Sequence, residues 1–296
     1  MSTPVLGPWE GQVAGLLIGA GTPYRWRREG LKGLTRRPPA RTQDEDVVGG
    51  DGVHTGDDTI DARVLTLQID VDPRRTGTTL AAALADLEQA FRPKRDVESW
   101  WRLPIWSTPR RLTVRVRNYE APPDVGLRAA TVVDVQLFAA DPVLYGPDQS
   151  IAPVGFPEQL GGLRYPLYTD GALVTGYLDY GPPSTSGRFT LRNDGTADVW
   201  PWFEVVGPTP PGGITLVRTD TAERIQFEGA VAAGAILRLD SADGSAVIDG
   251  TADRGGQLTW RDWWPARAGE QVEVAFLPLG PRTGAQLIPH APSGWW

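Results

Sequence analysis

Residues 141–147, Asp-Pro-Val-Leu-Tyr-Gly-Pro, separate two parts of the chain that have different patterns. The part before them reads as short strands and one helix, whereas the part after them has a Gly/Pro-rich passage and then strands alone. The 296 residues also exceed the roughly 100–200 residues of a usual domain. Because Pro142 and Pro147 restrict the backbone, the junction should be a semi-rigid mount. We therefore expect an N-terminal domain over 1–147, a connecting segment over 148–187 and a second domain over 188–296.

The composition argues against several kinds of protein. A formal net charge of -7 disfavours a general nucleic-acid binder, which needs a basic surface to neutralise phosphates. The absence of cysteine rules out disulfides and thiolate metal sites. The first residues lack the basic and apolar regions of a secretory signal, and no apolar run approaches the roughly 18 residues of a membrane span. We therefore expect a soluble protein made in a cytoplasm.

The first part contains one clear strand and one clear helix. Over residues 63–72 apolar and polar side chains alternate, which predicts a strand with one buried face, and Pro73 ends it. Thr79 is then a suitable N-cap for a helix that stops at Pro93 and should pack on the sheet. Its apolar residues at helical spacing are Leu80, Leu84, Leu87 and Phe91. Further strands are predicted at 16–18, 24–26, 111–117 and 131–138.

Residues 43–61 are polar, acidic and rich in glycine. Several carboxylates close together could hold a calcium ion, which prefers oxygen ligands. The spacing of an EF-hand loop is absent, however, because no glutamate stands at the twelfth position. We therefore favour a flexible, solvated loop over a metal site, and we expect no metal or cofactor elsewhere.

Two groups of side chains in the first part are candidates for a subunit or partner interface. Tryptophan occurs three times in seven residues, and burial in the core is as compatible with this cluster as a subunit contact, while a ligand platform is less so. Arginine alternates with apolar residues along one predicted strand. These arginines could face phosphates, or carboxylates of a neighbouring strand or subunit. We favour carboxylates, because 19 basic and 20 acidic residues leave 1–150 near neutrality. The candidates are Trp100, Trp101, Trp106, Arg111, Arg115 and Arg117.

Short strands separated by turns fill residues 188–296. They recur at intervals of roughly 8–12 residues without a helical pattern, which indicates an antiparallel β-sandwich. The fold class is therefore mainly β, with one helix in the first domain. Trp260, Trp263 and Trp264 invite a sugar-binding interpretation, because indole faces stack on pyranose rings. Packing in the core and at the edge of the sandwich is the favoured alternative, since a sugar site also needs polar side chains clustered around the ring.

No catalytic motif stands out in the sequence. The two histidines, His54 in the acidic loop and His290 near the C-terminus, belong to no metalloprotease helix, and no nucleophile elbow, P-loop or dinucleotide fingerprint is found. Paired carboxylates could serve a glycosidase, yet 36 acidic residues give no way to choose a pair. We therefore expect a structural or binding protein and not an enzyme.

Several short motifs, taken in order, resemble the distal tail (Dit) proteins of long-tailed siphophages. The second part is similar to the galectin-like sandwich of that family, and the resemblance covers nearly the whole chain. In the first part the motifs are Tyr24 after a glycine-rich turn, Asp51-Gly52, Gly56-Asp57, Arg63 opening an alternating strand, the helix after it, and Asp141-Pro142 with Tyr145. In the second part they are Asn193-Asp194-Gly195 with Pro201, Gly207-Pro208, Leu239-Asp240 and Trp263-Trp264 before Gly269-Glu270.

The resemblance implies a virion structural protein at the tip of the phage tail, assembled in the host cytoplasm. The N-terminal domains would form a tail-tube-like hexameric ring next to the tail tube protein, and tape-measure protein and later DNA would pass through its lumen. The C-terminal sandwiches would contact tail-tip or baseplate hub proteins and receptor-binding or fibre proteins. Neither a cofactor nor a membrane partner is implied. The alternative left open is a carbohydrate-binding adhesion module that acts on host-surface glycans.

Overall fold

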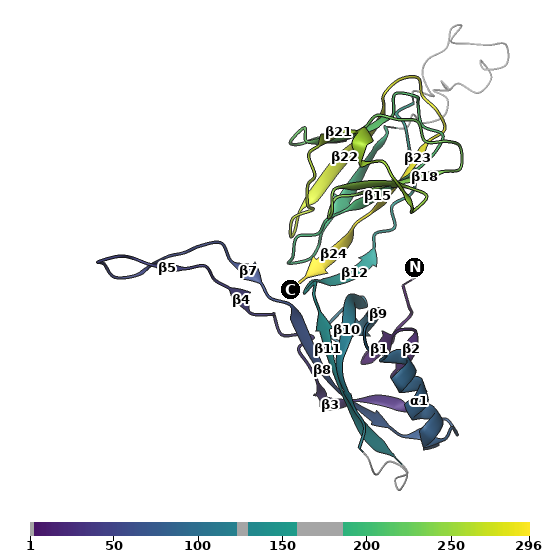
Figure 1. The fold of residues 1–296 in the computed structure, drawn as a ribbon. Coiled ribbons are helices and arrows are strands. Elements are labelled where there is room, and N and C mark those ends of the chain that lie inside the picture. The colour runs from purple at the N-terminus through teal and green to yellow at the C-terminus, as the bar shows by residue number, and fades with distance from the viewer. Residues whose placement is uncertain (1–2, 123–129, 159–185) are drawn as a thin grey trace, which may run out of the picture. The chain divides into compact units, whose positions relative to one another are not determined.

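The computed structural model describes residues 3–122, 130–158 and 186–296. Contacts between residues divide the chain into two compact units (Figure 1). Unit 1 comprises Met1–Pro147 together with Gly294–Trp296, and unit 2 comprises Asp148–Ser293. The chain therefore leaves unit 1 after Pro147 and returns to it with its last residues, a return that the sequence patterns do not predict.

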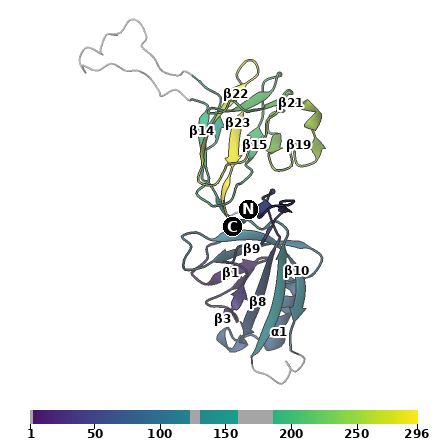
Figure 2. The same cartoon turned by 90° about the vertical axis from the view of Figure 1, so that its left-hand side faces the viewer.

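Unit 1 is built on an antiparallel sheet with the strand order β2-β1-β9-β10-β11-β8-β3 (Figure 2). Buried and exposed side chains alternate along β8 and β11, as the sequence predicts, and the buried ones join one core. These strands are β1 (Glu10–Val13), β2 (Leu16–Ile18), β3 (Tyr24–Lys32), β8 (Arg63–Val71), β9 (Asp96–Arg102), β10 (Arg110–Glu120) and β11 (Thr131–Ala139). Off this path, β12 (Leu144–Asp148) pairs with β10 and with β24 (Pro292–Trp295).

The predicted helix is confirmed as α1 (Leu80–Ala90). The Thr79 hydroxyl accepts a hydrogen bond of 3.2 Å from the amide of Ala82 and so caps the N-terminus. Leu87 is fully buried, and burial of a leucine side chain contributes roughly 1.5–3 kcal/mol to stability. The Tyr24 hydroxyl of β3 donates a hydrogen bond of 2.9 Å to the carbonyl of Ala83, which ties α1 to the sheet.

Residues 39–61 form a hairpin, called the arm below, that projects from the sheet of unit 1 (Figure 1). Near its base β4 (Ala40–Arg41) pairs with β7 (Thr59–Ile60), and nearer its tip β5 (Glu45–Asp46) pairs with β6 (Val53–His54). The expected flexible loop over 43–61 is therefore a paired hairpin. Its strands have only two residues each and are almost wholly exposed, so they lack the alternation by which a strand is recognised.

Unit 2 is the predicted antiparallel sandwich. One sheet has the strand order β13-β23-β15-β18-β19-β20 and the other β14-β22-β16-β17-β21, and their inner faces share a core. The first sheet contains β13 (Val154–Gly155), β15 (Trp202–Val206), β18 (Ile236–Asp240), β19 (Ser245–Ile248), β20 (Ala252–Asp253) and β23 (Gln286–His290). The second contains β14 (Arg188–Arg192), β16 (Ile214–Arg218), β17 (Arg224–Phe227), β21 (Leu258–Arg261) and β22 (Gln271–Pro278).

Part of the expected connecting segment belongs to unit 2. Val154 of β13 pairs with Leu287 of β23, and the Phe156 ring stacks on the Phe276 ring with centroids 4.4 Å apart. An edge strand expected around Leu173 lies outside the described residues. Two 3-10 helices, η1 (Pro73–Arg75) and η4 (Gly255–Gln257), complete the elements. In the described part of the chain, no helix is long and apolar enough to cross a membrane.

Candidate interaction site

Arg63, the first residue of β8, is a buried cation in unit 1, with only 1% of its surface exposed. Its guanidinium donates to four backbone carbonyls and to no carboxylate of the described residues, and its Nη2 atom has no hydrogen-bond partner there. Burial lowers the pKa of Arg63 to about 10, because desolvation penalises the charged form. The carbonyl acceptors, with their distances, belong to Gly33 (2.9 Å), Leu34 (3.1 Å), Arg36 (2.7 Å) and Pro142 (2.9 Å).

Glycine at position 33 lets the backbone wrap around this guanidinium. Gly33 has a φ of 88°, which side-chain-bearing residues rarely adopt. A Cβ added there would also collide with the carbonyl oxygen of Val64. The close approach of residues 33–36 to β8 therefore depends on Gly33.

A pocket of about 480 Å³ opens beside Arg63. Its basic lining includes the exposed Arg36 and Arg37, and its apolar lining includes Val64 and Phe138. Val64 is 47% exposed and pairs with Phe138 across β8 and β11. Arg36 and Arg37 have no carboxylate partner among the described residues, so the pocket carries net positive charge over an apolar floor. It is called the Arg63 pocket below.

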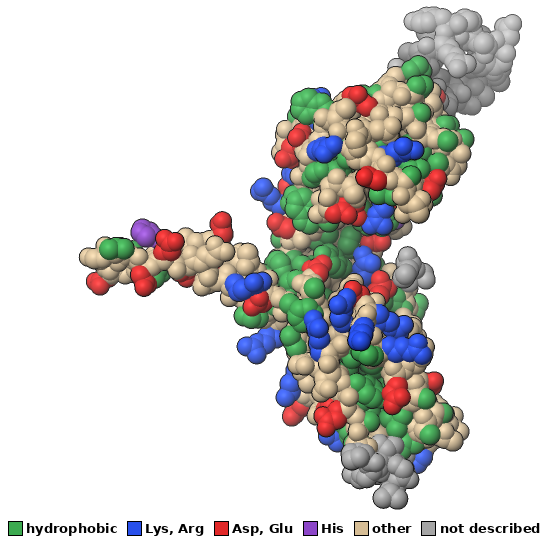
Figure 3. Space-filling model, in the orientation of Figure 1, with side chains coloured by type: hydrophobic (Ala, Val, Ile, Leu, Met, Phe, Trp, Pro, Cys, Tyr) green, Lys and Arg blue, Asp and Glu red, His purple; other side chains and the backbone are tan. Residues whose placement is uncertain are grey.

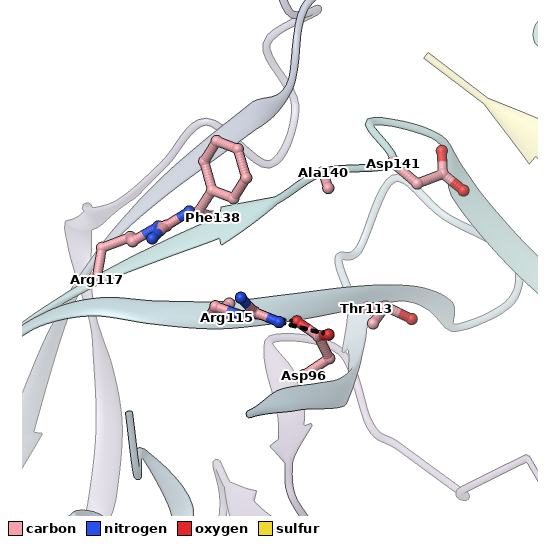
Figure 4. A pocket seen from close by; sticks show the side chains of 7 residues that line it. All are labelled: Asp96, Thr113, Arg115, Arg117, Phe138, Ala140 and Asp141. Atoms are coloured by element: carbon pink, nitrogen blue, oxygen red, sulfur yellow. Dashed lines mark hydrogen bonds and ion pairs between the residues drawn. The ribbon is translucent and has the colours of Figure 1, made fainter. Parts of the chain in front are cut away.

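The predicted row of arginines on β10 borders a second pocket, of about 280 Å³ (Figure 4). The Arg115 guanidinium forms two hydrogen bonds, of 2.9 and 2.8 Å, with the carboxylate of Asp96 on β9, and these lower the pKa of Asp96. The exposed Arg117 instead lies over the Phe138 ring, with its Cζ atom 4.6 Å from the centroid. Phe138 lines both pockets, so the two depressions adjoin on the same side of the sheet.

Arg111, the third member of the row, is engaged elsewhere. Its Nη1 atom lies 3.6 Å from Glu98, and its Cζ atom is 5.9 Å from the ring centroids of both Trp100 and Tyr145. The Tyr145 hydroxyl donates a hydrogen bond of 2.7 Å to Asp141. Burial, followed by the charge of Asp141, raises the pKa of Tyr145. Arg111 and Arg115 thus have partners in their own chain, whereas Arg117 has no carboxylate partner in the described residues.

The tryptophans of the first candidate group are buried within unit 1. Trp100, Trp101 and Trp106 are 6%, 1% and 8% exposed, so in the single chain they are part of its packing. The Trp101 indole donates to Ser99 at 2.9 Å and lies 5.1 Å, centroid to centroid, from the Trp26 ring. Their burial leaves the arginines, and not the indoles, at the surface.

Trp106 also belongs to a stack that no sequence pattern indicates. The Arg110 guanidinium lies between two indoles, 4.4 Å from the Trp106 centroid and 4.0 Å from that of Trp295, which returns with the C-terminal residues of unit 1. Burial lowers the pKa of Arg110 to about 10, and its Nε atom has no hydrogen-bond partner among the described residues. Unit 1 therefore holds a second buried cation without a carboxylate.

The tryptophans of unit 2 offer little open surface to a sugar. Trp264 is 1% exposed, and Trp263 packs against the core. Trp260 is 45% exposed, but the Cζ atom of Arg224 lies 3.4 Å from its ring centroid and covers one face. These positions match the packing alternative better than a platform for pyranose rings.

A further aromatic group in unit 2 is Trp202, whose ring is covered on both faces. The His290 ring stacks on it with centroids 3.6 Å apart, and the Arg238 guanidinium lies 4.3 Å from the same centroid. Two groups this close cannot share one face, so they occupy opposite ones. His290 Nδ1 and Nε2 lie 3.7 Å from Asp148 and 3.5 Å from Glu204. Among the described residues, no cluster of three or more acidic or histidine side chains is arranged to hold a metal ion.

Comparisons with known proteins identify the fold. No family model matches the sequence, and no curated protein does either. The crystal structure of the phage SPP1 Dit protein aligns with 97% of this chain and 99% of its own, at a TM-score of 0.63 and 13% sequence identity. The structure of the phage P2 baseplate in its activated conformation with calcium aligns over 90% of both chains, at a TM-score of 0.50 and 12% identity. The expected Dit-like fold is thus confirmed along nearly the whole chain.

Proposed function

We propose that this protein is a structural component of a phage tail tip and acts as a Dit-type adaptor. Unit 1 would form a hexameric ring that continues the tail tube, and unit 2 would hold tail-tip, baseplate or receptor-binding proteins. The observation that carries the proposal is the shared fold over both units of the SPP1 Dit protein, described as a paradigm of hub adsorption apparatus in phages that infect Gram-positive hosts. Because fold alone does not fix function, the assembly itself must be tested.

The charges of unit 1 support a role in assembly. Arg63 and Arg110 are buried without a carboxylate of their own chain, and buried charges are usually paired. Arg36, Arg37 and Arg117 leave further positive charge at the surface beside Arg63. Such a surface fits an acidic protein partner. Tape-measure protein and DNA would pass through the lumen of the ring, and the protein would reside in the virion.

Electron microscopy and light scattering of the purified full chain test this function. We expect rings with an open centre and a mass that corresponds to about six chains of 32.1 kDa. Addition of the tail tube protein from the same phage should place the ring at the end of the tube. A protein that stays monomeric at every concentration, both alone and with the tube protein, would contradict the proposal.

A further inference from the structure

We propose that the Arg63 pocket binds the acidic arm of a second copy of this chain. The inference rests on the proposed assembly and names the contact that would hold neighbouring copies together. The arm and the pocket are different surfaces of the same unit. Each copy would therefore offer its arm to one neighbour and its pocket to the other.

The pocket has the chemistry of a carboxylate site. Arg63 supplies a buried positive charge whose four hydrogen bonds all go to neutral carbonyls. An incoming carboxylate would offset the cost of burying that charge, because opposite charges attract strongly where water is excluded. Arg36 and Arg37 at the rim, with Arg117 beyond Phe138, add three cations that lack carboxylate partners among the described residues. Planar guanidinium groups bind carboxylates through paired hydrogen bonds.

The arm carries the complementary charge. Residues 43–58 contain six acidic residues and no lysine or arginine. All six are exposed, as the acidic side chains along the arm in Figure 3 illustrate. The apolar side chains of Val48 and Val53, 101% and 52% exposed, could contact Val64 and Phe138 on the floor of the pocket. The acidic residues are Asp44, Glu45, Asp46, Asp51, Asp57 and Asp58.

The geometry of the arm directs it to another copy. Pro39 and Asp61 at its base line the Arg63 pocket, and the paired strands carry the tip away from the sheet (Figure 1). Each leg has about ten residues at roughly 3.3 Å per residue, a reach of about 30 Å. To fill its own pocket, the tip would have to fold back and break both ladders. A neighbouring pocket needs no such rearrangement.

A contact between two different surfaces of one chain is heterologous. Repeated from copy to copy, it closes into a ring if the rotation between copies permits, or continues as a filament if it does not. The contact is thus of the type that a hexameric ring requires. Because it joins exposed charges, its strength should fall as salt rises.

Charge reversal tests the contact in the full-length protein. The arm variant carries Glu45→Lys, Asp51→Lys and Asp57→Lys, and the pocket variant carries Arg36→Glu, Arg37→Glu and Arg117→Glu; in the described residues none of these side chains forms an ion pair. Either variant should raise the concentration at which half of the protein is assembled by about tenfold or more, measured by light scattering. Combination of both sets in one chain should restore assembly to within about threefold of the natural protein. A control with Glu88→Lys and Arg254→Glu should assemble normally.

A photo-reactive amino acid in place of Val48 locates the partner surface directly. In a mixture of isotopically light and heavy protein, we expect cross-links between copies to peptides that contain Arg37 or Phe138. Normal rings from both single-site variants, or cross-links to a different surface, would overturn this inference and leave the proposed function standing. Absence of any assembly or intermolecular cross-link in the natural protein would overturn both.

Discussion

The two units treat a buried arginine in opposite ways. In unit 2, Arg218 is 6% exposed, and its guanidinium forms two hydrogen bonds, of 2.7 and 2.8 Å, with Asp220 and another with Glu270. These carboxylates raise the pKa of Arg218. In unit 1, Arg63 is buried more deeply but bonds only to carbonyls, and its pKa is lowered to about 10. Two buried groups of one chemical type therefore have pKa values shifted in opposite directions.

This contrast distinguishes a self-sufficient unit from one that lacks counter-charges. The surface arginines of unit 2 also pair within their own chain, as Arg188 does with Glu273 and Arg192 with Asp194. On the sheet of unit 1, Arg36, Arg37 and Arg117 have no such partner in the described residues, while the acids of the arm lie out of their reach. Unit 1 is the part that a second copy would complete.

Replacement of the two buried arginines should have the largest effect, and an unequal one. Arg63→Met leaves up to four carbonyls around Arg63 without their donors, so we expect a loss of about 3–5 kcal/mol in the free energy of unfolding of unit 1. Arg218→Met frees carboxylates that water can reach, and its cost should be nearer 2 kcal/mol. Urea unfolding, followed by hydrogen exchange in each unit, measures both. Equal costs would remove the contrast.

Loss of the returning C-terminus should weaken unit 1 and spare unit 2. Trp295→Ala removes one of the two indoles that enclose Arg110 and exposes that cation, at a cost of about 2 kcal/mol. Trp200→Ala, at a site that is 44% exposed, is the matched control in unit 2 and should cost less than about 1 kcal/mol. Hydrogen exchange should show faster opening of β10 and β12 in the first variant only. Faster exchange throughout unit 2 as well would argue against this assignment.

Acid should affect unit 2 through the carboxylates around Arg218. The hydrogen bonds from Arg218 lower the pKa of Asp220 to about 2, below its usual 3.8. A carboxyl whose pKa is lower in the folded state stabilises the fold above its unfolded pKa and loses that contribution as pH falls through the folded value. We therefore expect Asp220→Asn to flatten the loss of stability between about pH 4 and pH 2. An unchanged slope in thermal unfolding across this range would show that the ion pair contributes little.

The smallest effects should separate two arginines of β10. Arg115→Gln and Arg117→Gln alter exposed side chains, so neither should shift the unfolding midpoint appreciably. Arg115 is already paired with Asp96, whereas Arg117 is free of carboxylates in the described residues. Assembly should therefore weaken by about threefold for Arg117→Gln and change less for Arg115→Gln. Light scattering over a dilution series distinguishes these outcomes, and a reversed order would contradict the role given to Arg117.

Sequence patterns predict elements whose side chains alternate, and miss those that depend on distant contacts. Thr79 and the leucine spacing identify α1, and the alternation in 63–72 identifies β8. Strand β23 contains Pro289, which would disfavour a central strand. The structure accommodates it because β13 pairs only with Gln286 and Leu287, so that Pro289 lies beyond that pairing. The arm strands are too short and too exposed to show a period.

The candidate site was predictable in part. The alternation on β10 brings out Arg115 and Arg117, and the structure places them beside Phe138. Arg63 at the start of an apolar strand gives no sign of burial, because the carbonyls that hold it come from residues 33–36 and from Pro142. The stack of Trp106, Arg110 and Trp295 is equally hidden, since it joins positions far apart in the sequence. Such contacts are properties of the folded chain.

Hydrogen exchange in the assembled and the diluted protein tests most directly whether unit 1 is the part completed by a second copy. On assembly, we predict slower exchange in the arm at 43–58, in 33–39 around the Arg63 pocket and in β11 near Phe138. Unit 2 should exchange equally in both states when no other tail protein is present. Slower exchange confined to unit 2, or none in the arm and the pocket of a protein that does assemble, would contradict the account.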